Sequence, residues 1–379
     1  MTTRDVELKR GLKDVYLDRT QASFIDGGEG KLLYRGYNIH DLAEKSTFEE
    51  VVYLLLYGKL PTEAQLNELD ANLKSNRTIP DEVYQIIEAT KGGHPMDVLR
   101  TSVSALASFD PDVEDNSPEA VLRKGVRLTS QTATIICAHY MIRQGNKPIS
   151  PSATLSHSAN FLYMMRGKEP DADEAKLMDV DFILHAEHGA NASAFASRVT
   201  ASTLADLHAA VVTGIGTLKG PLHGGAAESV MAMAEEIGDP AEATAYAKRV
   251  LEGHGRIMGF GHRVYRAEDP RAQHLRERSK ALGEKLGQPK WIQILDALVE
   301  AMAPYRAKGI HVNVDFFAGS IYQLMEIPED MFIPIFALGR IPGWTLQVLE
   351  QYENNILIRP LLYYEGPMDL EYIPLEARS

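Results

Sequence analysis

Several of the twelve histidines in this sequence are adjacent to glycine, among them the four residues His188, His223, His254 and His262. Glycine allows a backbone segment or a ligand to approach closely, so such histidines suit a loop or a helix terminus more than the apolar face of a core helix. A single histidine of this kind is an ordinary surface or capping residue about as often as it is a functional one. Four together favour an active site that uses histidine.

His223 is followed by residues 226–231, whose composition predicts a helix. The macrodipole at the start of a helix disfavours an added positive charge, so a histidine there tends to stay neutral. A neutral His223 suits hydrogen bonding to an oxyanion or an enolate.

His262 follows the glycine loop Gly259-Phe260-Gly261. This loop does not fit the dinucleotide-binding fingerprint, because no strand precedes it and the third glycine is missing. Its backbone amides could still bind part of a nucleotide ligand.

Asp315 lies among β-branched and aromatic residues in the segment 311–317. A carboxylate that loses water has a raised pKa and becomes a usable general base. The alternative is an ordinary helix N-cap, because an apolar run, residues 316–324, follows directly. The sequence alone leaves both interpretations open.

Three arginines interrupt apolar or turn-rich surroundings: Arg271, Arg340 and Arg359. A guanidinium group matches a carboxylate through two parallel hydrogen bonds, so three of them suit a substrate with two carboxylates. The alternative for each is a solvated surface arginine. It is strongest for Arg271, which lies in the charged segment 266–280.

Other catalytic patterns fit less well. The segment His185-Ala186-Glu187-His188 has a helical spacing that could ligate zinc or a di-iron centre, but the carboxylate partners of such a centre are not evident. No Gly-x-Ser-x-Gly elbow, Walker loop or His-Glu-x-x-His motif is present. We therefore expect no bound metal.

The elements that must hold these residues are mainly helical. Capping-box spacing predicts helix starts at Ser46, with Glu49, and at Thr62, with Gln65, and Pro95 suits a first helical position. Period-two patterns are scarce and are confined to the first forty residues, at 23–28 and 32–36. The sequence predicts a mainly α protein with a short N-terminal β element.

Composition narrows the class of protein. The chain has 379 residues, 45% of them hydrophobic and 24% charged, which is typical of a folded globular protein of one large or two moderate domains. The net charge of −13 repels nucleic acid and anionic membranes at long range. Neither is an expected partner, and an anionic ligand would need a local cluster of arginines.

The single cysteine, Cys137, cannot form an intrachain disulfide, which favours a reducing cytoplasm. The first five residues are polar and charged, and no apolar run approaches the roughly 20 residues of a membrane span. We expect a cytoplasmic protein without a membrane segment.

Several segments together resemble the citrate synthase family, in the small bacterial and archaeal form that includes 2-methylcitrate synthases. The match begins at residues 23–27 and 33–37 and continues to Arg359-Pro360. Its central motifs are Gly220-Pro221-Leu222-His223-Gly224-Gly225, Met258-Gly259-Phe260-Gly261-His262-Arg263 and Asn313-Val314-Asp315-Phe316. Their order and spacing make a chance match improbable.

The resemblance implies a multi-helical homodimer that condenses acetyl-CoA with oxaloacetate and hydrolyses citryl-CoA. A large domain, residues 1–218 and 323–379, would hold the dimer interface and the oxaloacetate site, and a mobile small domain, residues 219–322, would bind acyl-CoA. Asp315 would remove a methyl proton while His223 hydrogen-bonds the enolate. His262 would polarise the oxaloacetate carbonyl and protonate the alkoxide.

Binding residues follow from the same resemblance. Oxaloacetate would contact His188, Arg271, Arg340 and, from the other subunit, Arg359. The acyl-CoA loop would be Arg256, Ile257, Met258, Gly259 and Phe260, with Arg77 and Lys308 as further candidates for a substrate carboxylate or a CoA phosphate. Asn191 and Ser193 would orient His223 from behind. No metal or redox cofactor is implied.

Alternatives remain at this stage. The sequence does not separate acetyl-CoA from propionyl-CoA, which would make a 2-methylcitrate synthase. A metal-dependent hydrolase and a catalytically silent homologue are further alternatives, although His223, His262 and Asp315 are all present. Two positions depart from the family pattern: Ala227 stands where asparagine is usual, and Ala318 stands where serine is common.

Overall fold

The computed structural model describes residues 7–12 and 14–378. It begins with an antiparallel sheet of β1 (Ser23–Asp26), β2 (Lys31–Tyr34) and β3 (Tyr37–Asn38), in that order. Ser23 pairs with Tyr34 and Asp26 with Lys31. The predicted β element is thus confirmed, and β3 is a short addition that the sequence pattern did not indicate.

Helices make up nearly all of the rest. The first group is α1 (Ile39–Lys45), α2 (Phe48–Tyr57), α3 (Glu63–Ser75), α4 (Asp81–Thr90), α5 (Pro95–Leu106), α6 (Pro118–Arg143), α7 (His157–Arg166), α8 (Ala172–His185), α9 (Ala192–Ser202) and α10 (Leu207–Leu218). The second group is α11 (Ala226–Ile237), α12 (Ala243–Glu252), α13 (Ala272–Lys285), α14 (Lys290–Ala301), α15 (Asp315–Leu324) and α16 (Phe332–Glu353). Short 3-10 helices lie at Arg10–Leu12, Ala107–Phe109, Pro240–Glu242, Ala303–Lys308, Glu329–Met331 and Leu375–Ala377.

Helix starts follow the predicted capping signals, with one shift. Thr62 caps α3 through a capping box with Gln65, as predicted. The α2 box is formed by Thr47 and Glu50 and not by Ser46 and Glu49. Ser46 instead ends α1, where its hydroxyl donates to the carbonyl of Leu42 at 2.6 Å. Since both registers have capping-box spacing, only the preceding helix decides between them.

Helix α16 is the central helix of the core. It packs against α2, α5, α6, α8, α9 and α10. Close approach depends on small residues, because a Cβ at Gly125 of α6 would lie 2.4 Å from Thr345 and one at Gly214 of α10 would lie 2.9 Å from the Trp344 ring.

The same helix corrects one prediction. The stretch Glu329–Glu353 is long and apolar enough to cross a membrane by length and composition, although no run of that kind was expected from the sequence. The structure buries 94% of its apolar window inside the protein. Arg340 and Gln347 interrupt the apolar pattern, so the sequence shows no uninterrupted apolar run of that length. Both side chains are buried in the protein interior.

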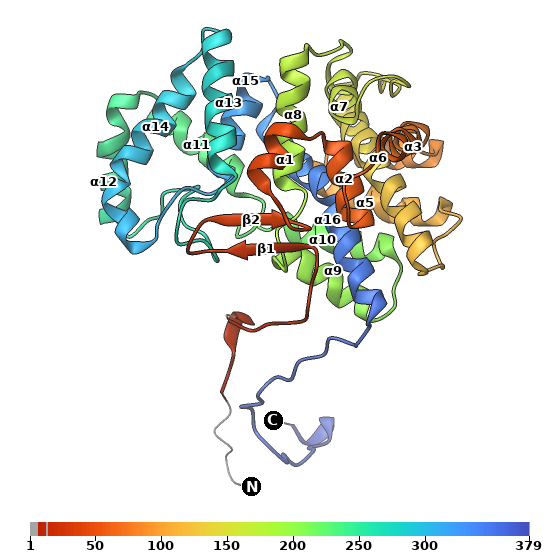
Figure 1. The fold of residues 1–379 in the computed structure, drawn as a ribbon. Coiled ribbons are helices and arrows are strands. Elements are labelled where there is room, and N and C mark those ends of the chain that lie inside the picture. Colours follow the sequence, from red (N-terminus) through yellow and green to blue (C-terminus); the bar gives the residue numbers. More distant parts are fainter. Residues whose placement is uncertain (1–6, 13, 379) are drawn as a thin grey trace.

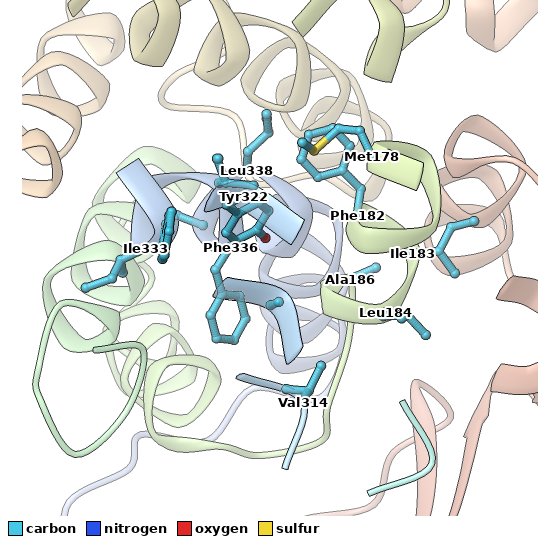
Figure 2. Close-up of a cluster of buried hydrophobic side chains, with 14 of the residues drawn as sticks. Met178, Phe182, Ile183, Leu184, Ala186, Val314, Tyr322, Ile333, Phe336 and Leu338 are labelled. Carbon is cyan, nitrogen blue, oxygen red and sulfur yellow. The ribbon is translucent and has the colours of Figure 1, made fainter. Parts of the chain in front are cut away.

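Helices α11 to α15 pack mainly against one another, and Figure 1 shows α11, α12, α13 and α14 grouped on the side opposite α2 to α7. Helix α15 connects the two groups. Figure 2 shows Tyr322 of α15 beside Phe336 of α16, close to Phe182 and Met178 of α8. Together with the hydrogen bond from the Tyr322 hydroxyl to Asp181 at 2.6 Å, this cluster packs the C-terminal part of α15 against α8.

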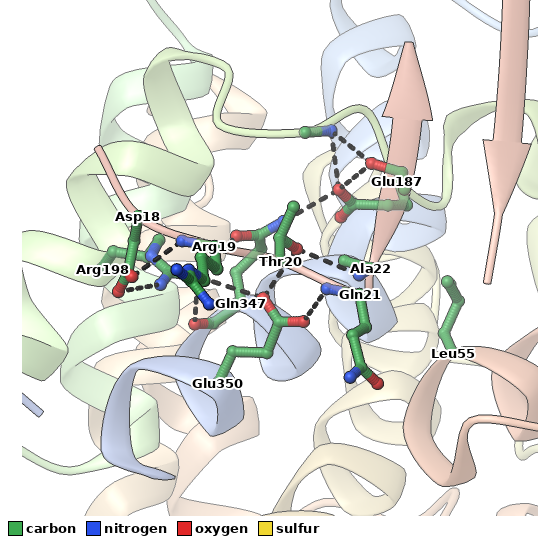
Figure 3. Close-up of polar contacts among 12 residues, drawn as sticks. Asp18, Arg19, Thr20, Gln21, Ala22, Leu55, Glu187, Arg198, Gln347 and Glu350 are labelled. Carbon is green, nitrogen blue, oxygen red and sulfur yellow. Dashed lines mark hydrogen bonds and ion pairs between the residues drawn. The ribbon is translucent and has the colours of Figure 1, made fainter. Parts of the chain in front are cut away.

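The two ends of the chain differ. The N-terminal segment is held against α16, because Glu350 accepts hydrogen bonds from the Gln21 amide and the Thr20 hydroxyl, both at 2.8 Å (Figure 3). Beyond α16, Asn355 and Ile358 still hydrogen-bond to Ser202 of α9. Residues 359–378 then extend away from the rest of the chain (Figure 1) and leave large apolar side chains exposed, among them Leu361, Leu362 and Leu370.

Candidate active site

His223 lies in the turn just before α11, as its motif predicted. Its Nε2 lies 2.8 Å from the Ser193 hydroxyl. Ser193 is fixed in turn by Asn191, the N-cap of α9, at 2.8 Å, and by the Trp344 indole N–H at 3.1 Å. Trp344, which pattern reasoning did not single out, thus connects the core helix α16 to the site.

The protonation of His223 follows from these contacts. The backbone N–H of Ser193 points at Nε2 at 3.3 Å, and since an amide can only donate, we assign the ring proton to Nδ1. Burial, aided by Arg340, lowers the pKa of His223 to about 4. The imidazole is therefore neutral at pH 7, with one N–H available to a ligand.

His262 is held by a loop that pairs with the segment before α15. Phe260 forms a β-bridge with Val312, and the Asn313 amide donates to the Gly259 carbonyl at 3.0 Å. Gly259 has φ +75°, and a Cβ there would lie 2.5 Å from Phe316. This pairing brings the His262 loop to the start of α15.

His262 is also neutral. Its Nδ1 accepts the backbone N–H groups of Val264 at 3.0 Å and Tyr265 at 3.1 Å, so the ring proton lies on Nε2. Burial lowers its pKa to about 4. The His188 ring lies 5.3 Å away between centroids, and its Nε2 is 3.2 Å from the Tyr265 hydroxyl.

Asp315 is the first residue of α15 and is only 9% exposed. The N-cap position belongs to Val314, and no side chain caps this helix, so the N-cap alternative is not what the structure shows. Burial raises the pKa of Asp315 to about 6, although His185, Arg271 and Arg340 oppose the shift. A carboxylate of this kind is ionised at pH 7 and still basic enough to accept a proton.

Arg271 is buried, which overturns the surface alternative that its charged neighbourhood favoured. It is 2% exposed, and its guanidinium binds both oxygens of Asp269, at 2.9 and 2.7 Å. Burial lowers the pKa of Arg271, but the Asp269 carboxylate outweighs this and the net shift is upward. Asp269 was missed by the sequence analysis, and its place two residues before Arg271 was the available signal.

Arg340 is buried on α16 and has a free donor. It is 1% exposed, its Nε donates to the His185 carbonyl, and its Nη1 has no hydrogen-bond partner among the residues that the structure describes. Burial lowers its pKa to about 10. A buried cation with an unused N–H is costly unless an anion completes it, so Arg340 fits a carboxylate-binding group.

The family model described as citrate synthase, C-terminal domain, matches residues 11–361. The chain belongs to the citrate synthase family.

Its relatives and neighbours agree. The citrate synthase of Deinococcus radiodurans is 44% identical over 374 residues, covering 98% of this chain and 99% of that protein. The 2-methylcitrate synthase 1 of Corynebacterium glutamicum is 38% identical, covering 99% and 100%. The citrate synthase of Thermoplasma acidophilum, solved as a ternary complex with carboxymethyl coenzyme A and oxaloacetate, is 32% identical with a TM-score of 0.93, covering 98% and 100%.

Two predicted binding residues of this citrate synthase family member lie apart from the cluster. Arg77 is 2% exposed and donates to the backbone carbonyls of Ser152 and Leu155, so its guanidinium closes the loop before α7. Its binding of a substrate carboxylate or a CoA phosphate stays a prediction. Arg359 is exposed, six residues beyond the end of α16.

The predicted acyl-CoA loop has a buried half and an exposed half. Ile257 and Gly259 are buried, and the Phe260 ring packs edge-on against Phe316 at 4.8 Å. Arg256 and Lys308 are exposed, and the Lys308 ammonium lies 5.4 Å from the Tyr305 ring. Met258 is half-buried. Exposed cations next to an anchored loop suit an anionic, flexible ligand such as CoA.

Glu187 is a further site residue without a predicted role. Its Oε1 accepts the Gly189 amide at 2.6 Å, the Gln347 amide at 2.9 Å and the Ser23 hydroxyl at 3.1 Å, and Figure 3 shows it among the polar contacts of α16. Burial raises its pKa to about 7, opposed by Arg340. Glu187 fixes the turn that carries His188.

The metal alternative finds no arrangement to support it. Among the residues that the structure describes, no group of three or more histidine, cysteine, aspartate or glutamate side chains is placed to hold a metal ion. Of the motif that suggested it, His185 faces Asp181 and Glu187 faces Gly189.

Of the two positions that depart from the family pattern, Ala318 is buried, and the side chain of Ala227 lies outside the described residues.

Proposed function

We propose that this protein is a citrate synthase that joins acetyl-CoA to oxaloacetate and hydrolyses the resulting citryl-CoA to citrate and CoA. The observation that carries the proposal is the placement of three buried or half-buried groups: Asp315 at the start of α15, His262 in the loop that pairs with the segment before α15, and His223 held by Ser193. The raised pKa of Asp315 and the lowered pKa values of the two histidines are consistent with a basic carboxylate and neutral imidazoles. All three are influenced by the buried guanidinium groups of Arg271 or Arg340. A condensation through an enolate needs this combination.

In the first step, Asp315 takes a proton from the methyl group of acetyl-CoA. Electron density moves to the thioester oxygen, and the Nδ1–H of His223 stabilises that oxygen by hydrogen bonding. A neutral imidazole is a suitable donor because the pKa of its N–H is far higher than the pKa of an imidazolium N–H.

In the second step, the enolate carbon forms a bond to the ketone carbon of oxaloacetate. The Nε2–H of His262 polarises the ketone oxygen and then protonates the alkoxide. Water then attacks the citryl thioester and returns a proton to His262. The carbon–sulfur bond breaks, and CoA leaves as the thiol with the proton that Asp315 took in the first step.

The substrate carboxylates have matching groups. Within the described part of the chain the Nη1 of Arg340 has no hydrogen-bond partner, and Arg271 is oriented by Asp269, so each guanidinium is suited to bind one carboxylate of a dicarboxylate. His188, whose pKa burial holds well below its usual range, would donate a hydrogen bond without adding charge.

Release of CoA tests the proposal. Protein mixed with acetyl-CoA, oxaloacetate and a thiol reagent should liberate free CoA, and omission of oxaloacetate should stop it. The variant Asp315→Asn is the inactive control, and Asp41→Asn, which removes an exposed carboxylate of α1, is its matched active control. Absence of CoA release from folded wild-type protein contradicts the proposal.

We propose acetyl-CoA as the preferred substrate and 2-methylcitrate synthesis from propionyl-CoA as the second candidate. The second candidate is favoured by the similarity to the Corynebacterium glutamicum 2-methylcitrate synthase. One methylene in an apolar pocket changes binding by only about 1–3 kcal/mol, so the ratio of kcat/KM for the two thioesters must be measured. A ratio in favour of propionyl-CoA reverses this assignment.

We also propose a homodimer in which Arg359 reaches the active site of the partner. Two features support it: Arg359 is exposed, and the apolar residues of the extended tail, such as Leu362 at 96% exposure, need a covering surface. Residues 219–322 are proposed to move as a small domain over acyl-CoA, which would exclude water from the enolate.

A further inference from the structure

The β1–β2 hairpin contacts two turns that carry predicted site histidines. Strands β1 and β2 have four residues each, and a hairpin this short is marginal by itself. Leu32 and Tyr34 of β2 are fully buried and anchor the hairpin in the core, whereas Phe24 of β1 is 53% exposed. Strand β2 thus supplies the anchor, and β1 and the turn after it supply the contacts to other segments.

The turn of the hairpin binds the loop that follows His262. The Gly27 carbonyl accepts the amides of Arg266 at 2.7 Å and Ala267 at 3.3 Å. The two preceding amides, of residues 264–265, donate to His262 Nδ1. Four successive amides are thus bound by one carbonyl of the hairpin and one imidazole nitrogen. A shift of the hairpin turn must therefore move the donors that hold the His262 ring.

The contact between the turn and this loop is too close for a side chain. A Cβ at Gly27 would lie 2.3 Å from the Val264 carbonyl oxygen. Gly30 has φ +65°, and a Cβ there would lie 2.7 Å from the Glu268 carbonyl oxygen. A Cβ at Gly28, in contrast, would meet only a side-chain oxygen at the end of β1, at 3.4 Å. Two of the three glycines therefore permit a backbone contact that a side chain would prevent.

Strand β1 binds the turn around His188 in a similar way. The Ser23 hydroxyl donates to Glu187 Oε1 and accepts the Gly189 amide, both at 3.1 Å. Gly189 has φ +57°, and a Cβ there would lie 3.2 Å from Ile25 Cδ1. Strand β1 therefore contacts both sequence neighbours of His188.

The two histidines that the hairpin reaches lie side by side. The ring centroids of His188 and His262 are 5.3 Å apart. Tyr265 connects them, because its amide donates to His262 Nδ1 at 3.1 Å and its hydroxyl lies 3.2 Å from His188 Nε2. One short element near the start of the chain thus contacts both segments that meet at this point.

We propose that the β1–β2 hairpin is a positioning element that sets the placement of His188 and His262 relative to each other. Gly27 acts through the backbone that holds the His262 ring, and Ser23 acts through the turn that carries His188. Both are positioning residues, since each acts through another residue. The inference rests on the proposed function, in which His262 polarises the ketone of oxaloacetate and His188 donates to the same substrate.

Gly27→Ala and the neighbouring Gly28→Ala are the matched pair for steady-state kinetics. In Gly27→Ala the added Cβ must displace the Val264 backbone, so kcat should fall about tenfold to a hundredfold and the KM for oxaloacetate should rise about fivefold to tenfold. The KM for acetyl-CoA should stay within about twofold, because both histidines are assigned to oxaloacetate. In Gly28→Ala, where the Cβ has room, all three constants should stay within about twofold.

The tautomer of His262 is a second readout, which needs no turnover. Its pKa of about 4 leaves the ring neutral at pH 7, where nitrogen-15 NMR of the imidazole should show a protonated Nε2 and an unprotonated Nδ1. Gly28→Ala should give the same signal. Gly27→Ala should give a mixture of the two tautomers, because the amides that bind Nδ1 are displaced. The signal is identified by its loss in His262→Gln.

Ser23→Ala and Ser23→Thr test the His188 side and decide the proposal if Gly27→Ala does not fold. Ser23→Ala removes the hydroxyl that binds Glu187 and Gly189, so the KM for oxaloacetate should rise about threefold to tenfold. Ser23→Thr keeps a hydroxyl in a residue that suits a strand, and its KM should return to within about twofold of the wild-type value.

Three results would overturn the proposal. The first is a folded Gly27→Ala protein with wild-type constants and a wild-type His262 tautomer. The second is an equal loss in Gly27→Ala and Gly28→Ala, which would belong to the turn in general. The third is the same KM for oxaloacetate in Ser23→Ala and Ser23→Thr. Wild-type protein that releases no CoA would instead overturn the proposed function, while the His262 tautomer would still decide whether the hairpin holds that ring.

Discussion

At the scale of single residues, the proposed site depends on side chains that hold other side chains in place. Ser193 holds the Nε2 of His223 and is itself held by Asn191 and Trp344. Side chains that hydrogen-bond to one ring nitrogen of a catalytic imidazole, and the residues that hold those side chains, fix its tautomer and its orientation. Replacing them should therefore affect turnover more than substrate binding.

We predict that Ser193→Ala lowers kcat by about tenfold to a hundredfold with little change in either KM. Ser197→Ala is the control, since Ser197 is equally buried on α9, one turn later, but bonds only the carbonyls of Ser193 and Ala210. Steady-state kinetics of both variants check this. Equal losses in the two would show that the effect is one of packing.

Asp315 makes a prediction about stability and pH. Burial raises its pKa to about 6 from an ordinary 3.8, so the folded protein holds this proton more tightly than the unfolded chain. The carboxylate therefore destabilises the fold above about pH 6, and the penalty vanishes as the pH falls towards 4. Asp315→Asn should gain up to roughly 3 kcal/mol at pH 8 and nothing at pH 4.

Urea unfolding at pH 8, 6 and 4 measures this gain. Asp41→Asn should show no gain at pH 8, because its Lys45 partner lowers the pKa of that exposed carboxyl. The Asp315 variant should also lose roughly 10²–10⁴ of kcat, the usual contribution of a general base. A variant that is inactive but no more stable at pH 8 would separate the base role from the cost of burial.

At the scale of elements, the loop before His262 is defined by how closely it approaches α15. Gly259 and Gly261 both have positive φ, at +75° and +87°. A Cβ on Gly259 would meet Phe316 at 2.5 Å, whereas one on Gly261 would meet nothing within 4 Å. The two glycines therefore separate backbone strain from steric contact.

We predict that Gly261→Ala costs about 1–2 kcal/mol from backbone strain alone. Gly259→Ala should cost about 1–3 kcal/mol more, because the loop must also move away from α15. Chemical unfolding measures both, and kcat should fall further in Gly259→Ala, since the displaced loop carries His262. Equal costs for the two variants would mean that the contact with Phe316 is relieved without disturbing the loop.

How far the sequence predicts this structure depends on the distance over which each signal acts. Helix identity and capping are local, so Thr62 and Pro95 are found where their patterns predict. The burial of Arg271 is not local: it follows from Asp269, whose amide donates to the Val312 carbonyl at 3.3 Å. A charged stretch of sequence gave no sign of that long-range contact.

The candidate site shows the same limit. His223, His262 and Asp315 were visible because glycine and apolar neighbours mark them in the sequence. Trp344 was not visible, and Glu187 was named only as a possible metal ligand, since their contacts appear only when α16 is placed against α9 and the β1 strand. The structural contacts of Arg77 could not be predicted, because the backbone carbonyls that it binds lie more than 70 residues away.

At the scale of the whole molecule, the proposed exchange of Arg359 between subunits can be tested by complementation. Arg359→Ala and Asp315→Asn should each be nearly inactive alone. If Arg359 acts in the partner's site, a mixed dimer has one site with both residues intact. Refolding the two variants together should then restore about a quarter of wild-type activity, as half the dimers are mixed and one of two sites works in each.

The control is a mixture of the two variants refolded separately. As long as their subunits do not exchange, this mixture should remain inactive. If Arg359 acts within its own subunit, neither site of a mixed dimer is complete and refolding restores nothing. A folded monomer in sedimentation, fully active on its own, would contradict the dimer itself.

The position of α16 in the chain has a consequence for synthesis. Its covering helices, α2, α5, α6, α8, α9 and α10, all precede it in the sequence. Because a ribosome makes the chain from the N-terminus, the most membrane-like segment emerges only after every surface that will bury it has been made. The interval in which a chaperone or a membrane-insertion machinery could engage that segment is correspondingly short.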